Sequence, residues 1–195
     1  MHEQNNEKTE SLGDPRFELT ELDGDMGIPT ELKGFRIICR TATGYASAKC
    51  FEGYHLDITN DDTEVVDPDF FGIESVANKT GEPGIASSLV RASLQEAIRR
   101  GFSKGRVRVL NPKILTILEK MQSEGLVSDI ECYLGDNATR IHFSTSELAA
   151  RYTPVTSEVA KQHLEMYPDT NDVINEDAVA ETVFRIANQS DLEPK

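Results

Sequence analysis

The sequence of 195 residues predicts an α/β protein of the α+β kind, with a mixed, mostly antiparallel sheet flanked by helices. Three observations favour this class: early segments alternate between apolar and polar residues, the middle reads strand, turn, helix, strand, helix, and a hairpin pattern follows. We expect a disordered acidic lead at 1–15, one domain at 16–152 and an acidic helical extension at 153–195.

The first part of the domain has the pattern of antiparallel strands. The alternation predicts strands at 16–22, 34–40, 44–51 and 54–58. The first of them is weak and is expected to be an edge strand, and Thr41-Ala42-Thr43 joins the second to the third. The acidic segment 59–69, which contains Pro68, is expected to be a loop or an edge ribbon.

The middle of the domain predicts a phosphate-binding turn. An apolar strand at 70–77 leads into Gly81-Glu82-Pro83-Gly84-Ile85-Ala86, and a helical pattern runs from 87 to 100. A second strand at 106–110 and a second helix at 112–122 follow. A glycine turn that opens a helix directs unpaired backbone N–H groups and the positive end of the helix dipole at one point. Such a point favours an anion.

The end of the chain predicts a hairpin and two further helices. Strand patterns at 127–134 and 139–144 flank Gly135-Asp136-Asn137, and helical patterns follow at 156–167 and 175–188. The last helix would carry an apolar stripe made of Val179, Val183, Phe184 and Ile186. The stripe is expected to pack on the chain's own sheet or on a dimer partner, with a recognition surface for another protein as the alternative.

The net charge of −14 is concentrated at the two ends of the chain. Residues 1–33 and residues 153–195 each hold nine acidic and three basic side chains, whereas 34–152 holds sixteen and fourteen. The acidic ends argue against nonspecific nucleic-acid binding. Between 91 and 113 one acid, Glu96, stands among Arg91, Arg99, Arg100, Lys104, Arg106, Arg108 and Lys113. This basic band suits a polyanionic cofactor, and an ordinary solvated face is the alternative.

Composition also bears on location and on metal binding. The chain has no apolar run of membrane-spanning length, and its first residues lack the pattern of a signal peptide, so a cytoplasmic protein is expected. The odd set Cys39, Cys50 and Cys132 predicts buried thiols in a reducing compartment. Neither the cysteines nor the four histidines have metal-ligand spacing, and the acidic run 57–69 lacks the glycine and the closing glutamate of a calcium loop.

From these motifs, residues 34–144 resemble the GNAT superfamily of acyl-CoA-dependent N-acetyltransferases. In that family a strand precedes the loop Arg/Gln-x-x-Gly-x-Gly/Ala, and Gly84 and Ala86 supply its last two fixed positions in register. The next strand of the family ends in an asparagine, which matches Asn111. In the helix that follows, Ile114, Leu118, Glu119 and Lys120 occupy the places of the family's fixed positions, before Gly125-Leu126. The resemblance implies that acetyl-CoA or CoA binds at Val76, Gly81, Gly84, Ile85, Ala86, Ser87 and Asn111.

Three departures from the family pattern bear on catalysis. Gly81 replaces the Arg or Gln of the loop, and Pro83 has no N–H to offer. Leu118 stands where many members keep the tyrosine that protonates the departing thiolate. The residues before Gly34 are also too few and too broken for the two helices that usually shape the acceptor site.

If the chain is an enzyme, an amine attacks the thioester directly and a base must deprotonate the ammonium. The resemblance places Glu74 where such members often keep that base, with His55 as a second candidate, and Tyr133 or His142 as a replacement acid. Each also has an ordinary interpretation: Glu74 as a solvent-facing or ion-paired strand residue, and Tyr133 and His142 as packed strand residues. The acceptor would be an amine-bearing small molecule or protein.

Two functions therefore remain open. The first is an acetyl-CoA-binding protein that acetylates an amine. The second is a catalytically degenerate scaffold that acts as a protein-interaction or regulatory module, as a homodimer or with a protein partner through its C-terminal helices.

Overall fold

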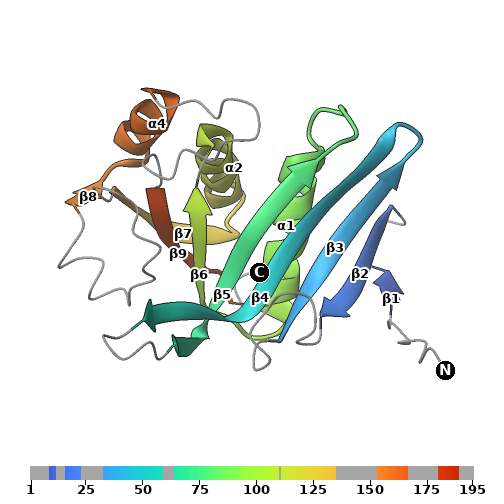
Figure 1. Cartoon of the computed structure of the whole chain (residues 1–195), viewed down its shortest axis with the longest axis horizontal. Helices are drawn as coiled ribbons and strands as arrows, with labels where there is room; N and C mark the ends of the chain where they lie inside the picture. The colour runs from blue at the N-terminus through green and yellow to red at the C-terminus, as the bar shows by residue number, and fades with distance from the viewer. Residues whose placement is uncertain are drawn as a thin grey trace. The chain divides into compact units, whose positions relative to one another are not determined.

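A computed structural model describes residues 9–11, 16–22, 33–58, 64–109, 111–134, 153–166 and 180–188. The contacts divide the chain into two units, which we describe in turn. Figure 1 labels the helices and strands. The first unit comprises Met1–Glu52 and Ile73–Ser93, and the second comprises Gly53–Gly72 and Leu94–Lys195.

The first unit is an antiparallel sheet followed by the beginning of a helix. Its strands are β1 (Thr9–Ser11), β2 (Phe17–Leu22), β3 (Lys33–Thr41), the first part of β4 (Gly44–Ile58) and the last part of β5 (Glu64–Asn78). Strands β1 to β4 pair in chain order, each antiparallel to the next. Helix α1 (Ile85–Arg99) begins in this unit.

Alternation along the strands separates a buried face from a more exposed one. Leu19, Ile37 and Ala48 lie opposite one another and are completely or almost completely buried, whereas their neighbours Arg36 and Lys49 are partly exposed. This is the two-residue period of a half-buried sheet. The predicted strands at 34–40 and 44–51 are confirmed.

The strand predicted at 16–22 is confirmed as β2, but the prediction that it is an edge strand is wrong. Thr9–Ser11 forms β1 and pairs with Glu18–Thr20, so β1 lies outside β2. Three residues of the expected disordered lead are therefore a strand. The β5 strand likewise begins at Glu64, inside the segment expected to be a loop or an edge ribbon. A strand of three residues, such as β1, is too short to show a periodicity.

The second unit is an antiparallel sheet with two helices. It contains the last part of β4, the first part of β5, the end of α1, β6 (Lys104–Val109), α2 (Pro112–Ser123), β7 (Val127–Leu134), β8 (Thr153–Val155), α4 (Ser157–Met166) and β9 (Ala180–Ile186). Four of its strands follow the order β6-β9-β7-β8, with antiparallel neighbours throughout. Helices α2 and α4 contact each other (Figure 1).

Helix α2 shows how local sequence sets an element's limits. Asn111 accepts a hydrogen bond from the Lys113 backbone N–H, and Pro112 fills the first helical position, where no N–H is needed. Buried Leu115, Leu118 and Met121 recur every three residues and form its packed stripe. The helices predicted at 112–122 and 156–167 are confirmed as α2 and α4.

The helix predicted at 175–188 is wrong, because Ala180–Ile186 forms strand β9. This strand lies between β6 and β7, and six of its seven residues are buried. Val183, Phe184 and Ile186 also fit a helical spacing, and so short an apolar cluster does not distinguish a helix from a strand. The apolar residues Val183, Phe184 and Ile186 are therefore buried in a strand and do not form a helical extension.

Phe184 shows the tightness of this packing. Its side chain is 3% exposed, and a Cβ atom added to Gly105 on β6 would lie 2.1 Å from the Phe184 ring.

The three cysteines are buried and unbridged, as predicted. In the part of the chain that the structure describes, no helix is long and apolar enough to cross a membrane. The predicted strand at 139–144, with His142, lies outside the described residues.

Candidate functional site

The turn between β5 and α1 is held by its own side chains. Asn78 Oδ1 accepts hydrogen bonds from Thr80 N and Thr80 Oγ1, at 3.0 and 2.7 Å. Thr80 Oγ1 in turn accepts from Glu82 N at 3.0 Å, and Asn78 Nδ2 donates to Glu82 O at 3.1 Å. The positive φ angles of Gly81 and Gly84, 72° and 84°, complete the turn. Its shape is therefore fixed by hydrogen bonds before any ligand binds.

The link between β3 and β4 supports this turn. Thr43 Oγ1 donates a hydrogen bond to Thr80 O at 3.0 Å, and Lys79 N donates to Tyr45 O at 3.0 Å. A Cβ atom added to Gly44 would lie 2.6 Å from Lys79 O, so the approach requires glycine. The sequence contained no signal for this support, since Thr43 and Thr80 are 37 residues apart.

The helix begins without a capping side chain. The first backbone bond of α1 runs from Ser88 N to Gly84 O at 3.0 Å. The N–H groups of Ile85, Ala86 and Ser87 precede that bond and have no acceptor within the helix. Gly84 carries no side chain to accept from them, and the first turn of α1 contains no acid. Three adjacent N–H groups at the positive end of a helix form a favourable place for an anion.

Only some of the backbone N–H groups of the turn are available to an anion. The Glu82 N–H donates to Thr80, and Pro83 has no N–H, so neither is available to an anion. A Cβ atom added to Gly84 would meet nothing within 4 Å. The N–H groups that remain available to an anion are therefore those of the first turn of α1. No atom blocks the approach to them at Gly84.

Two other predicted binding residues have different surroundings. Val76 is partly exposed on β5, in the same unit as the turn. Asn111 belongs to the second unit, and its Oδ1 is occupied by the Lys113 N–H at 3.0 Å. Asn111 thus has a structural task as the cap of α2, whatever else it binds.

The predicted base Glu74 lies on β5 and is paired with a cation. Its carboxylate is 2.8 Å from the Lys49 ammonium on β4, and the two side chains are 46% and 18% exposed. The Lys49 ammonium also lies 5.0 Å from the centre of the Phe51 ring. Sequence analysis did not identify Lys49, because a cross-strand pair depends on the register of β4 and β5.

Two other candidates for proton transfer are His55 and Tyr133, and the structure describes the side chain of Tyr133 alone. The side chain of His55 lies outside the described residues. Tyr133 on β7 is 4% exposed, and its hydroxyl donates to Glu131 Oε2 at 2.5 Å. Burial, and then the hydrogen bond and charge of Glu131, raise the pKa of Tyr133 to about 12. A thiol with a pKa of about 8.5 is a stronger acid, so this phenol is a weak donor to a thiolate.

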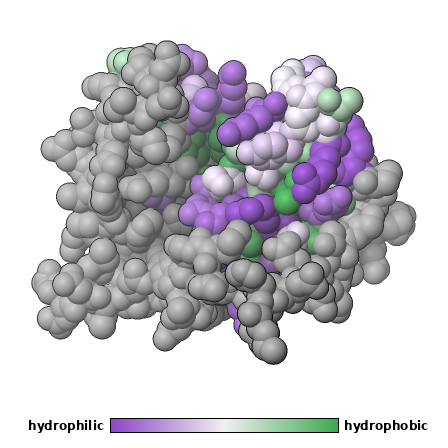
Figure 2. Space-filling view, turned by 45° about the vertical axis from the view of Figure 1, so that its right-hand side comes forward, coloured by the Kyte–Doolittle hydropathy of each residue, from purple (hydrophilic) through white to green (hydrophobic). Residues whose placement is uncertain are grey.

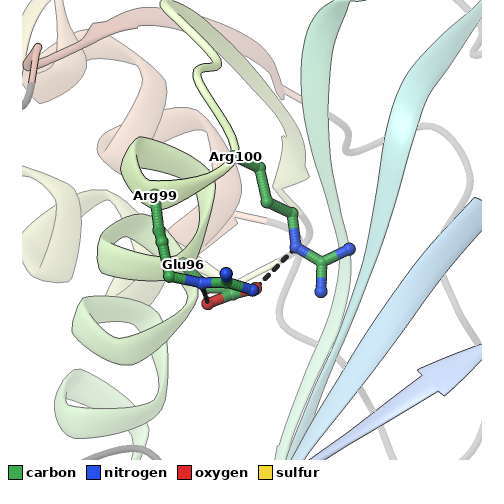
Figure 3. A network of polar contacts seen from close by, with 3 residues as sticks. All are labelled: Glu96, Arg99 and Arg100. Carbon is green, nitrogen blue, oxygen red and sulfur yellow. Dashed lines mark hydrogen bonds and ion pairs between the residues drawn. The ribbon is translucent and has the colours of Figure 1, made fainter.

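Part of the basic band is engaged within the protein. Glu96 on α1 is 2% exposed and accepts hydrogen bonds from Arg99 and Arg100, at 2.6 to 2.7 Å (Figure 3). Burial alone would raise the pKa of Glu96, but the hydrogen bonds and charges of the two arginines outweigh it and lower that pKa below 4.5. Arg106 is fully buried and pairs with Glu181 at 3.1 Å.

The described surface is mainly polar where Figure 2 shows it, with hydrophobic residues in small areas. Among the described residues, the large hydrophobic side chains with high exposure are Tyr45, Val159 and Met166. Val159 and Met166 are seven residues apart on α4 and so lie on one side of that helix.

No family model matches the chain, and a search of curated proteins finds no match. Among solved structures, the chain is similar to the diaminobutyrate acetyltransferase of Paenibacillus lautus, in complex with L-2,4-diaminobutyric acid and coenzyme A. The identity is 14% and the TM-score 0.40, over 77% of this chain and 68% of that one.

A Bacillus subtilis acetyltransferase in complex with CoA is also similar, with 14% identity and a TM-score of 0.33, over 88% of this chain and 78% of that one. The fold class that the sequence predicted is confirmed, with an antiparallel pairing pattern in both units.

Proposed function

We propose that the chain binds acetyl-CoA or CoA at the turn Gly81–Ser87 and transfers the acetyl group to an amine. The observation that carries the proposal is the uncapped start of α1, where the N–H groups of Ile85, Ala86 and Ser87 precede the first helical hydrogen bond. A pyrophosphate accepts several such bonds at once and complements the helix dipole.

The residues present fit such a cofactor. The backbone of Ile85, Ala86 and Ser87 would hold the pyrophosphate, and the open approach at Gly84 would let it come close. Acetyl-CoA supplies the acetyl group as a thioester when it is bound. The hydrogen bonds of Asn78 and Thr80 keep the donors in place, so little ordering is needed on binding.

Glu74 is the proposed base. It lies on the strand that ends at the turn, four residues before Asn78, which is about 13 Å along a strand. Its carboxylate would take one proton from the acceptor ammonium, so that the neutral amine could attack the carbonyl carbon. As the C–N bond forms and the C–S bond breaks, CoA would leave as a thiolate and take up the second proton that the nitrogen loses. The incoming ammonium must replace Lys49 as the partner of the Glu74 carboxylate, which is 46% exposed and therefore accessible from solvent.

An assay of acetyl transfer tests this function. In Glu74→Gln, turnover with an amine should fall by about 10² to 10⁴, while the affinity for CoA changes little, because the variant loses the proton acceptor alone. Glu21→Gln, which alters another exposed glutamate of the same unit on β2, is the matched control and should keep full turnover.

Two results would contradict the proposal separately. Folded wild-type protein that shows neither heat of binding nor a thermal shift with millimolar CoA would refute the cofactor site. Full turnover by Glu74→Gln would instead refute the assigned base and leave the cofactor site standing.

A second function, a catalytically inactive interaction module, is favoured by the surface of α4. Val159 and Met166 are 46% and 69% exposed on one side of this helix. Such a module would assemble through α4, as a homodimer or with a protein partner. It predicts that wild-type protein self-associates in sedimentation experiments, that Met166→Asp is a monomer, and that no amine is acetylated.

A further inference from the structure

An aromatic side chain and a cationic side chain lie together beside the turn that precedes α1. Tyr45 is the second residue of β4, and Lys79 directly follows β5. The Lys79 ammonium lies 5.8 Å from the centre of the Tyr45 ring. Both residues belong to the first unit, as does the turn. The start of β4 and the turn lie at the same end of the sheet of this unit (Figure 1).

The backbone joins the start of β4 to the turn. Lys79 N donates a hydrogen bond to Tyr45 O at 3.0 Å. Next to this bond, Thr43 Oγ1 donates to Thr80 O, also at 3.0 Å. A Cβ atom added to Gly44 would lie 2.6 Å from Lys79 O, so the two segments are in close contact. The backbone positions from which the two side chains extend are therefore fixed relative to the turn before a ligand binds.

Tyr45 exposes an aromatic surface at this place. The residue is 46% exposed with Lys79 in place over its ring. Among the described residues of the first unit, no other large hydrophobic side chain is so exposed. A flat heteroaromatic group stacks well on an aromatic ring that is open to solvent. Tyr45 thus offers a stacking surface next to the proposed anion site.

Lys79 supplies the positive charge of this region. It is the one basic residue in the segment 78–87, and it is exposed. Within the described part of the chain Lys79 makes no ion pair. Glu82, the acid of the same segment, accepts a hydrogen bond from Thr43 Oγ1 at 3.3 Å. A ring attracts a cation without neutralising its charge, so the Lys79 ammonium remains able to bind an anion.

We propose that Tyr45 and Lys79 bind the adenosine 3′-phosphate end of CoA, with the adenine stacked on the Tyr45 ring and the 3′-phosphate paired with the Lys79 ammonium. In CoA this end follows the pyrophosphate, on the side away from the thiol. An aromatic base and a phosphate on one nucleoside match a ring and a cation that lie 5.8 Å apart. The inference rests on the proposed cofactor site at the first turn of α1 and adds two binding residues to it.

Calorimetric titration of the full chain with three probes tests this assignment. CoA carries the complete adenosine end, dephospho-CoA lacks the 3′-phosphate alone, and 4′-phosphopantetheine lacks the whole nucleotide. Wild-type protein should bind CoA about tenfold more tightly than dephospho-CoA, because the latter lacks a charge-assisted contact. It should bind 4′-phosphopantetheine more weakly than either.

Two variants separate the two contacts. Tyr45→Ala should weaken the binding of CoA and dephospho-CoA about tenfold, because base stacking is lost, and leave that of 4′-phosphopantetheine unchanged. Lys79→Gln should weaken CoA about tenfold, to the affinity of dephospho-CoA, and leave dephospho-CoA unchanged. Tyr45→Phe keeps the ring and Lys79→Arg keeps the charge, so both should retain most of the affinity for CoA. Lys33→Gln, which removes an exposed lysine of the same unit on β3, is the control and should have no effect.

Three results would overturn the inference and leave the proposed cofactor site standing. The first is equal binding of CoA and 4′-phosphopantetheine by the wild type, and the second is wild-type affinity for CoA in Tyr45→Ala. The third is an equal loss of CoA and dephospho-CoA binding in Lys79→Gln, which would place Lys79 at the pyrophosphate. The absence of heat with all three probes would instead refute the proposed cofactor site, and this inference with it.

Discussion

The two ends of helix α1 differ: the C-terminal end is capped and the N-terminal end is not. At the C-terminal end, Gly101 N donates to Ile98 O and Phe102 N donates to Ala97 O, both at 3.0 Å, which is a Schellman motif around a glycine with a φ of 88°. Glu96 further ties this end to Arg99 and Arg100 (Figure 3). At the N-terminal end, Gly84 provides no capping group.

The other two described helices, α2 and α4, both have a side-chain cap. Asn111 caps α2, and Thr156 Oγ1 accepts a hydrogen bond from Val159 N at the start of α4. Helix α1 is longer than either, yet its first turn has no such side chain. A helix start that lacks a cap while its turn is firmly braced is suited to an external acceptor.

The largest expected effect is at the C-terminal end of α1. Glu96→Gln removes the charge that two arginines share and should lower the free energy of unfolding by about 2 kcal/mol, less than for a fully buried pair because Arg99 is 60% exposed. Chemical denaturation measures this loss. Arg99→Gln is the milder comparison, and an equal loss in both variants would show that Glu96 has no special role.

The same residue sets a pH dependence. The pKa of Glu96 is lowered in the folded protein, so its contribution to stability is present above pH 4.5 and is lost as the pH falls through the lowered value. Wild-type protein should therefore lose stability on acidification more steeply than Glu96→Gln. Parallel slopes between pH 5 and pH 3 for the two proteins would contradict the pairing.

The next effect concerns the capped helix. Asn111→Ala should destabilise the protein by about 1 kcal/mol through loss of the α2 cap, whereas Asn111→Ser should retain most of the stability. If capping is the only task of Asn111, both variants bind CoA as the wild type does. A loss of CoA affinity in the stable Ser variant would show the binding role that the family resemblance implies.

The smallest expected effect concerns CoA binding at the uncapped N-terminal end of α1. Pro83→Ala adds an N–H to the turn and should raise the affinity for CoA about threefold, since one further hydrogen bond contributes about 0.5 to 1.5 kcal/mol. Its melting temperature should change little. Weaker binding by this variant would mean that the fixed proline backbone matters more than the missing donor.

Local patterns predicted much of the fold. The strands β2, β3 and β5 and the helices α1, α2 and α4 each carry a period or a terminal signal in their own residues, such as the Asn111-Pro112 start of α2. The failures have a non-local origin. The residues of β9 are buried on both sides by strands that are distant in the sequence, and β1 is too short to show a pattern.

The candidate site divides in the same way. The glycine turn was predictable, because positive φ angles at Gly81 and Gly84 require glycine. The support from Thr43 and the pairing of Lys49 with Glu74 depend on register between strands. Single-sequence patterns do not contain that register, so these partners could be found only in the structure.

A titration with CoA of two matched glycine variants tests the central claim most directly. Gly84→Ala and Gly101→Ala both place a methyl group at a positive φ with nothing within 4 Å, at opposite ends of α1. Both should lose about 1 kcal/mol of stability from backbone strain. We predict that Gly84→Ala lowers the affinity for CoA at least tenfold, whereas Gly101→Ala binds CoA as the wild type does. Equal affinities for CoA in the two variants would contradict the account.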